Sequence, residues 1–184
     1  MRISLAVAIL VVGAVLVANG ASSATPSNAT AAHLSSLSGK AFDVAFCQAL
    51  IPVQEEAIEM AMTATLNADH SELLKWNQVL VERNNAQVRQ MLAWLDAMGS
   101  HPTVRNAGVA TPSVKKLRAL KGAALEKAYI PMMTSQMDQS AALARLAAQK
   151  SDKPELRTFA QGIVKMDGQE SPMLRGWLKH WYNS

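Results

Sequence analysis

A segment of the sequence recurs 83 residues later, and this repeat restricts the possible folds more than any other feature of the chain. The segment LSSLSGKAFDVAF, residues 34–46, aligns with LRALKGAALEKAY, residues 117–129. The same shift, without a gap, pairs Asp69 with Asp152. The repeat therefore predicts that the protein consists of two copies of one structural unit.

Each copy is predicted to contain two helices. In the first copy, apolar residues recur at steps of three and four over residues 42–64, which is the period of an amphipathic helix. Asp69 and Glu72 then form an Asp-x-x-Glu box, a typical start of a helix, and Asp152 and Glu155 repeat it. A second helix is thus expected to begin at each box.

The segment GSHPTVRNAGVATP, residues 99–112, holds both Gly and Pro and has no apolar period, so it is predicted to link the copies. The copies then extend over residues 34–98 and 113–184. Thr111 and Pro112 have the character of a helix cap and a first helical residue. Because no segment alternates as a strand does, the two helical hairpins are expected to bury their apolar stripes against each other as an antiparallel four-helix bundle.

The N-terminus has the layout of a secretory signal peptide over residues 1–24. Arg2 precedes an apolar run from Leu5 to Ala18, and small residues follow up to a cleavage position near Ala24. The run is short for a membrane span, which needs about 20 residues. We expect a secreted or periplasmic protein with a flexible leader over residues 25–33 and no stable membrane insertion after cleavage; an uncleaved anchor is the alternative.

Composition excludes several classes of function. The formal net charge is +4, without a cluster of Lys and Arg, so nucleic acid binding is not indicated. The single cysteine, Cys47, allows no intramolecular disulfide and is interpreted as a small buried residue of a helix. The sequence has no phosphate loop, nucleophile elbow or zinc-protease motif, and an enzyme is not expected. Its protein partners cannot be named from these features.

Related motifs occur in both copies with the same spacing. The first copy contains Phe46, LIPVQEEAIEMA (residues 50–61), SELL (71–74) and QVRQMLAWL (87–95). The second contains Tyr129, MTSQMDQSAALA (133–144), PELR (154–157) and ESPMLRGWL (170–178). The segments resemble the motifs of a family of secreted, ferritin-like helical bundles, domain of unknown function 305. The resemblance extends over nearly all of the chain after the signal peptide.

This resemblance implies binding of copper or related metals in the periplasm or outside the cell, through paired histidines in the first helix of each copy. Here those positions hold Val53 and Gln54 in one copy and Gln136 and Met137 in the other. The histidines of the chain all lie away from the motif: His33, His70, His101 and His180. The imidazole ligands that the resemblance implies are therefore absent.

Methionine thioethers are candidate replacement ligands, and they select soft monovalent ions such as Cu(I) and Ag(I). Met133 and Met137 are four residues apart and so share one face of a helix. Glutamine side chains could add weak oxygen donors. The candidate metal ligands are Met60, Met91, Met133, Met137, Gln54 and Gln136.

Methionine on a helical stripe is also a common packing residue. The alternative is therefore a metal-free structural or protein-interaction module of the cell envelope, in which the metal site has degenerated. Glu55, Glu56 and Glu59 lack the histidines of a di-iron site, and Glu55 and Glu59 are displaced from the apolar stripe. These three carboxylates are interpreted as a solvent-exposed helix face.

Overall fold

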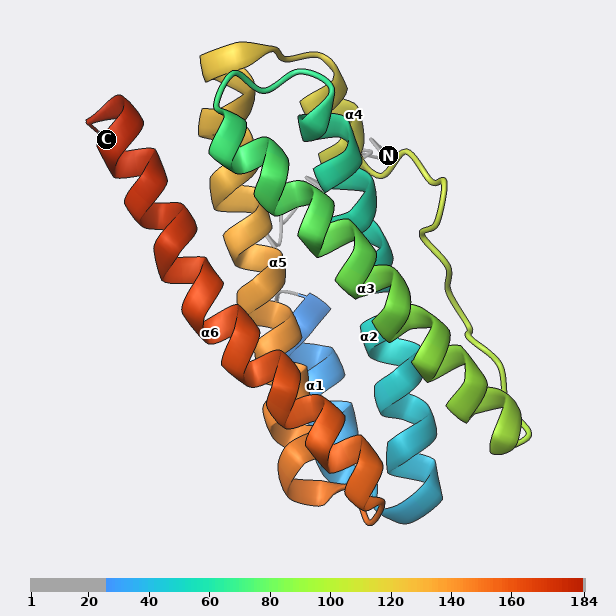
Figure 1. Ribbon diagram of the computed structural model, residues 1–184. Helices are drawn as coiled ribbons and strands as arrows, with labels where there is room; N and C mark the ends of the chain where they lie inside the picture. The colour runs from blue at the N-terminus through green and yellow to red at the C-terminus, as the bar shows by residue number, and fades with distance from the viewer. Residues whose placement is uncertain (1–25, 184) are drawn as a thin grey trace, which may run out of the picture.

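The structure, a computed structural model, describes residues 26–183, and this part of the chain is all-α, as predicted (Figure 1). It contains no strand. The six helices in these residues are α1 (Pro26–Ser36), α2 (Gly39–Thr65), α3 (Ser71–Ala97), α4 (Pro112–Arg118), α5 (Gly122–Lys150) and α6 (Pro154–Tyr182). The predicted signal peptide, residues 1–24, lies outside the described residues.

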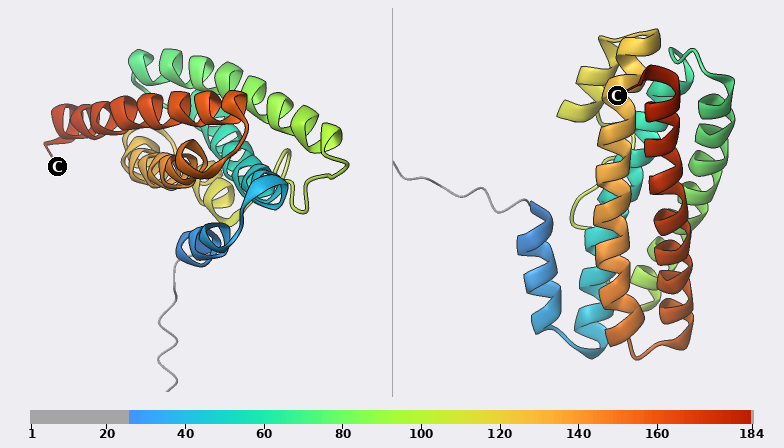
Figure 2. Two further views of the ribbon diagram at one scale, coloured as in Figure 1. Left: turned by 90° about the horizontal axis from the view of Figure 1, so that it is seen from below. Right: turned by 90° about the vertical axis from the view of Figure 1, so that its left-hand side faces the viewer.

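Four long helices form two antiparallel hairpins, α2 with α3 and α5 with α6 (Figure 1). Seen along the bundle, α2 and α5 lie in one layer and α3 and α6 in the other (Figure 2). Residues 99–111 run back along the bundle from the end of α3 to α4. One long crossover of this kind occurs in ferritin-like bundles. Among residues 26–183, no helix is both long enough and apolar enough to cross a bilayer.

Helix α1 differs from the flexible leader expected over residues 25–33. Residues 26–36 are helical and lie outside the four long helices, against α5 and α2 (Figure 2). Leu34 is buried in the same cluster as Phe42 and Phe46 of α2. The buried core therefore begins at the first residue of the first predicted copy, and the helix that carries this residue extends back to Pro26.

The apolar core consists of two clusters, one toward each end of the bundle. The first is built mainly from the N-terminal halves of α2 and α6 and the C-terminal halves of α3 and α5; its members include Phe42, Phe46, Leu50, Ile51, Met91 and Leu95. The second lies at the end of the bundle that carries α4, and its members include Tyr129, Trp76, Met60, Leu73, Leu80, Leu117 and Met133. A layer with polar residues lies where the two clusters meet, near the midpoints of the four long helices.

Capping differs in part from the prediction. Thr111 does cap α4, because its side chain accepts a hydrogen bond from the Val114 amide, with Pro112 at the first helical position. The two Asp-x-x-Glu boxes do not form, since α3 and α6 begin without a side-chain cap. Asp69 instead lies over the start of α5, where a Cβ on Gly122 would come within 2.6 Å of Asp69 Oδ2. Gly122 also has φ +52°, so only glycine fits there.

Two buried carboxylates, 83 residues apart, hold the two hairpins together. Asp43 of α2 accepts a hydrogen bond from Ser151 Oγ (2.7 Å), in the turn between α5 and α6. Glu126 of α5 accepts hydrogen bonds from the backbone amides of Asp69 (2.7 Å) and His70 (2.8 Å), in the turn between α2 and α3. Each hairpin thus provides a carboxylate for the turn of the other.

Candidate functional site

Four of the six predicted metal ligands line one small cavity in the middle of the bundle: Gln54, Met133, Gln136 and Met137. The cavity has a volume of about 10 Å³. A space of this size accommodates about one water molecule or one ion. The structure therefore brings together the positions that carry the paired histidines in the family motif.

All four long helices contribute to the cavity wall, each from near its midpoint. The contributions are Val53, Gln54 and Ala57 from α2; Leu80, Arg83 and Asn84 from α3; Met133, Gln136, Met137 and Ser140 from α5; and Asp167 from α6. Four pairs of these residues are 83 positions apart: Val53 and Gln136, Gln54 and Met137, Ala57 and Ser140, Asn84 and Asp167. The cavity thus lies where corresponding positions of the two predicted copies meet.

The polar groups of the cavity leave two acceptor oxygens without a partner. Gln54 Nε2 donates to Ser140 Oγ (3.3 Å), and the Ser140 hydroxyl hydrogen-bonds to the Asp167 carboxylate. Among the described residues, Asp167 Oδ2 and Gln136 Oε1 are buried and have no hydrogen-bond partner. Buried polar atoms are normally paired, so two acceptors beside one small cavity favour a cation or a hydrogen-bond donor between them.

Burial raises the pKa of the Asp167 carboxyl from 3.8 to about 6, although its bond with Ser140 and the charge of Arg83 act in the opposite direction. At neutral pH the side chain is therefore mostly an anion. Arg83 is itself neutralised by Glu170, which accepts from its Nη2 at 2.8 Å. One negative charge, that of Asp167, then remains without a compensating group in the wall of the cavity.

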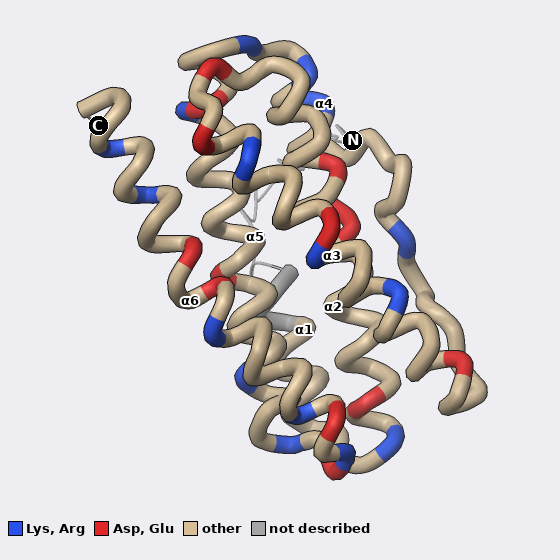
Figure 3. The backbone as a smooth tube through the Cα atoms, viewed as in Figure 1, with Lys and Arg blue, Asp and Glu red and all other residues tan. Residues whose placement is uncertain are grey.

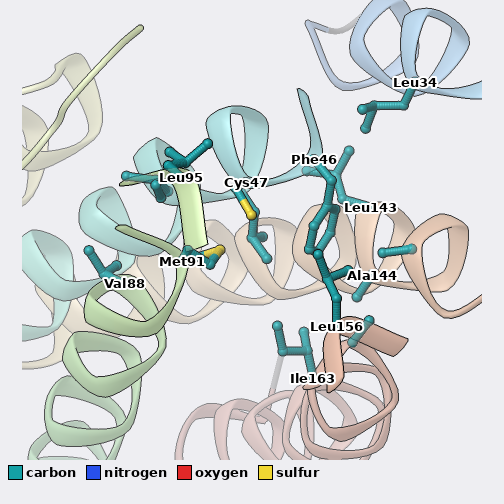
Figure 4. Packing of buried hydrophobic residues seen from close by; sticks show 14 of the residues in the cluster. Leu34, Phe46, Cys47, Val88, Met91, Leu95, Leu143, Ala144, Leu156 and Ile163 are labelled. Atoms are coloured by element: carbon teal, nitrogen blue, oxygen red, sulfur yellow. The ribbon is translucent and has the colours of Figure 1, made fainter. Parts of the chain in front are cut away.

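The structure does not bring the other two predicted ligands to this cavity. Met91 is fully buried in the first apolar cluster, where Cys47 lies nearby (Figure 4). Met60 is equally buried, in the second cluster, and does not line the cavity either. Burial raises the pKa of the Cys47 thiol to about 12, so Cys47 supplies no thiolate at neutral pH.

Three glutamates of α2, Glu55, Glu56 and Glu59, hold the crossover segment. Their interpretation as a solvent-exposed helix face is therefore wrong. Glu55 is 2% exposed, and its Oε2 accepts from the amides of Asn106 and Ala107 (3.2 Å). Arg105 Nε donates to Glu55 Oε1. The same segment supplies the donors for the other two: Glu59 accepts from the Gly108 amide (2.6 Å) and Glu56 from Thr111 Oγ1 (2.8 Å).

Other features of the described residues are weaker candidates for a site. A surface groove of about 510 Å³ includes Met62 and Leu66, which are 51% and 83% exposed, but none of the six predicted ligands. Residues 26–183 contain no group of three or more His, Cys, Asp or Glu that could hold a metal ion. Acidic and basic positions are scattered over the helices (Figure 3). The mid-bundle cavity remains the candidate site.

Asp167 is the most consequential of the polar cavity residues that the sequence analysis missed; the others are Arg83, Asn84 and Ser140. The signal of Asp167 was present in the periodicity of α6, whose buried residues are Leu156, Ala160, Ile163, Asp167, Ser171 and Leu174. A carboxylate on an otherwise apolar stripe is unusual, because an acidic side chain is rarely buried without a partner. The repeat offered a second signal, since the equivalent position holds Asn84, which is also buried.

Comparisons with known proteins agree with this fold. The family model described as Domain of unknown function (DUF305) matches residues 16–95 and 126–184. Among solved structures, CopM in the Cu(I)-bound form is similar with a TM-score of 0.68 and 19% identity, over 76% of this chain and 97% of that chain. CopM in the apo form gives a TM-score of 0.64 and 20% identity, over 76% and 98%.

A third structure is a DUF305 protein from Streptomyces coelicolor that is described as secreted. It has a TM-score of 0.68 and 20% identity, over 75% of this chain and 91% of that chain. No curated protein matches the sequence. At these identities the solved structures establish the fold alone.

Proposed function

The chain belongs to the domain of unknown function 305 family, and from this membership and the mid-bundle cavity we propose that it is an exported, non-enzymatic protein that binds Cu(I) or Ag(I). The thioethers of Met133 and Met137 are the proposed soft ligands. Gln136 lies in the same wall as a weak oxygen donor, and Gln54 lies there with its Nε2 donating to Ser140. Met60 and Met91 are left out of this ligand set.

One observation carries the proposal: two methionines on one face of α5 line a cavity of about 10 Å³ that also contains unpaired acceptor oxygens. Thioethers prefer soft monovalent ions to Zn(II) or Mg(II). Met133 is fully buried and Met137 is 4% exposed, so a bound ion would be largely shielded from water. Such shielding suits sequestration of an ion better than catalysis on a substrate.

Two comparisons support the proposal without establishing it. CopM has this fold and is described in Cu(I)-bound, Cu(II)-bound and Ag-bound forms, so a bundle of this architecture can hold such ions. The description of the Streptomyces protein as secreted supports export, as does the order of charge, apolar run and small residues at the N-terminus.

The alternative is a metal-free structural or protein-interaction module of the cell envelope. The observation that favours it is the absence of an imidazole, thiolate or carboxylate cluster with metal-ligand character among residues 26–183. In that case the methionines of the cavity serve only as packing.

A titration separates the two functions. The purified protein is titrated anaerobically with Cu(I) against a competing chelator, as wild type and as the double variant Met133→Leu, Met137→Leu. We expect one equivalent to bind to the wild type and the affinity to fall steeply in the variant. Leu retains most of the volume of Met, so each change should cost less than about 1.5 kcal/mol of stability.

The chain offers a matched control. Met60→Leu and Met91→Leu alter two methionines that are just as buried but lie outside the cavity, so this double variant should bind Cu(I) as the wild type does. If the wild type takes up no Cu(I), the metal-free alternative is correct. Equal losses in the two double variants would mean that the cavity is not the site.

A further inference from the structure

We propose that Asp167 is the anionic ligand of the bound ion and matches the site to a single positive charge. This inference rests on the proposed function, because it names a further ligand and the ion charge of the same cavity. Asp167 is the only contribution of α6 to the cavity wall.

Geometry is the first observation. Asp167 is 9% exposed and lines the cavity, while its Oδ2 has no partner among the described residues. The Ser140 hydroxyl interacts with the carboxylate, but Oδ2 stays without a partner within residues 26–183. A carboxylate buried only for structural reasons would be expected to have both oxygens paired. The free oxygen is therefore available as a ligand atom in the cavity wall.

The ligand set follows from the remaining residues. Met133 and Met137 supply two thioethers, and Gln136 Oε1 is a second buried oxygen without a partner. Gln54 is already engaged as a donor to Ser140, which holds that hydroxyl toward Asp167. The set is therefore two sulfur atoms and two oxygen atoms, of which one oxygen belongs to an anion.

The balance of charge gives the valence of the ion. Arg83 and Glu170 form a pair with side-chain exposures of 17% and 14%, and they cancel each other. The thioethers and amides are neutral, so the cavity carries a charge of about −1 at neutral pH. Cu(I) or Ag(I) brings the loaded cavity to zero, whereas Zn(II) would leave a net positive charge beside Arg83. An uncompensated buried charge is costly, so the site should discriminate against divalent ions.

The two predicted copies differ at this position in a way that fits one ion. The residue equivalent to Asp167 is Asn84, which also lines the cavity but is neutral. Two acids here would repel each other and would require a divalent ion or a proton. Asp167 and Asn84 together provide a single negative charge, because only Asp167 is an acid.

The inference is tested by Cu(I) competition titration of Asp167→Asn beside Asp96→Asn. Both variants remove one negative charge, but Asp96 is exposed on α3 and away from the cavity. We expect Asp167→Asn to weaken Cu(I) binding by about 10- to 100-fold, the range typical when a group that tunes a metal site is lost. Asp96→Asn should stay within about twofold of wild type, because an exposed charge is screened by salt.

X-ray absorption of the Cu(I)-loaded protein provides a readout that a purely structural role would not change. The wild type should show both sulfur and oxygen neighbours of copper, and Asp167→Leu should lose an oxygen neighbour while both sulfur atoms remain. Thermal unfolding verifies that Asp167→Asn and Asp167→Leu fold. Zn(II) should raise the melting temperature of the wild type less than Cu(I) does.

The outcomes distinguish this inference from the proposed function. If the wild type binds no Cu(I), both are wrong. If the wild type binds Cu(I) and Met133→Leu, Met137→Leu weakens binding while Asp167→Asn does not, the proposed function stands and the role of Asp167 is wrong. Equal stabilisation by Zn(II) and Cu(I) would likewise contradict the charge match.

Discussion

At the scale of single residues, Asp167 has opposite consequences in the metal-free and metal-bound protein. Its carboxylate is buried with one oxygen unpaired, and this burial disfavours the ionised form. A cation in the cavity would reverse the effect by giving the anion a partner. A residue that destabilises the empty bundle is then the one that favours the loaded bundle.

This reasoning predicts the pH dependence of stability of the metal-free protein. The pKa of Asp167 rises from 3.8 to about 6 on folding, so the folded state holds a proton more tightly than the unfolded state. The free energy of unfolding should therefore fall as pH rises from about 4 to about 6, by an amount on the order of 2–3 kcal/mol. The fall should level off by about pH 7, where the folded state is also mostly deprotonated.

The measurement is urea unfolding at several pH values, and the informative quantity is the difference between wild type and Asp167→Asn. Asn does not titrate, so the variant should lack this decline and be the more stable protein at pH 7. Asp96→Asn, with an exposed carboxyl, should follow the wild-type curve. Parallel curves for wild type and Asp167→Asn would show that Asp167 is not desolvated in solution.

At the scale of elements, the crossover between α3 and α4 is held against α2 by carboxylates. Glu55 accepts from Arg105, Asn106 and Ala107, and two further glutamates accept from Gly108 and Thr111. Backbone amides that would otherwise face solvent are thereby paired. The crossover has no regular secondary structure of its own, and the glutamates of α2 hold it in place.

Replacing Glu55 by Ala should therefore release the crossover. The loss of three acceptor contacts at a residue that is 2% exposed should cost about 2–3 kcal/mol in unfolding free energy. Trypsin should cut after Arg105 faster than in the wild type, because the Arg105 side chain loses its partner and the segment can leave the helix. The comparison is Glu82→Ala, which removes an exposed carboxylate of α3. An unchanged cleavage rate in Glu55→Ala would contradict the role of Glu55.

The sequence predicted the helices better than it predicted the loops and turns that pack on them. Apolar residues spaced three and four positions apart identify the side of α2 that faces other helices. Phe46, Ala57 and Met60 lie on this side and are buried as expected. The same period says nothing about a loop on the remaining side, so Glu55 was interpreted as exposed. Asp69 was expected to cap its own helix, but it lies over Gly122, a contact between residues distant in the sequence.

The candidate site was predictable in part for the same reason. Met133 and Met137 share a face through local helix geometry, and the resemblance placed Gln54 and Gln136 in the paired-histidine positions of the two copies. Met60 and Met91 also lie on buried stripes, but whether two buried stripes meet at one point depends on how far along the bundle each residue lies. That position is set by the packing of the whole molecule and cannot be read from periodicity.

At the scale of the whole molecule, an ion pair near the cavity connects the outer helices of the two hairpins. Arg83 of α3 donates to both carboxylate oxygens of Glu170 of α6, and Trp76 Nε1 donates to the same residue at 3.1 Å. The two side chains are 17% and 14% exposed, so water screens them weakly. These hydrogen bonds join α3 to α6 within their common layer.

Arg83→Leu should be strongly destabilising, because it leaves Glu170 and the nearby Asp167 without a positive neighbour. Breaking a buried pair in this way costs about 3–5 kcal/mol, and partial exposure places the expected value near the lower end. The double variant Arg83→Leu, Glu170→Leu should recover part of the loss in chemical unfolding. Arg175→Leu breaks a pair that is 52% and 59% exposed, and should cost less than about 1 kcal/mol. Equal costs for Arg83→Leu and Arg175→Leu would contradict the claim that water screens the Arg83–Glu170 pair only weakly.

The most direct test of the central claim is the position of a soft ion in a crystal of the Ag(I)-loaded protein, located by its anomalous scattering. A single strong peak is predicted in the mid-bundle cavity, bonded to the sulfur atoms of Met133 and Met137 and to the Asp167 carboxylate. Peaks found only at surface groups such as Met62 or His101, or no ordered peak at one equivalent of Ag(I), would contradict it.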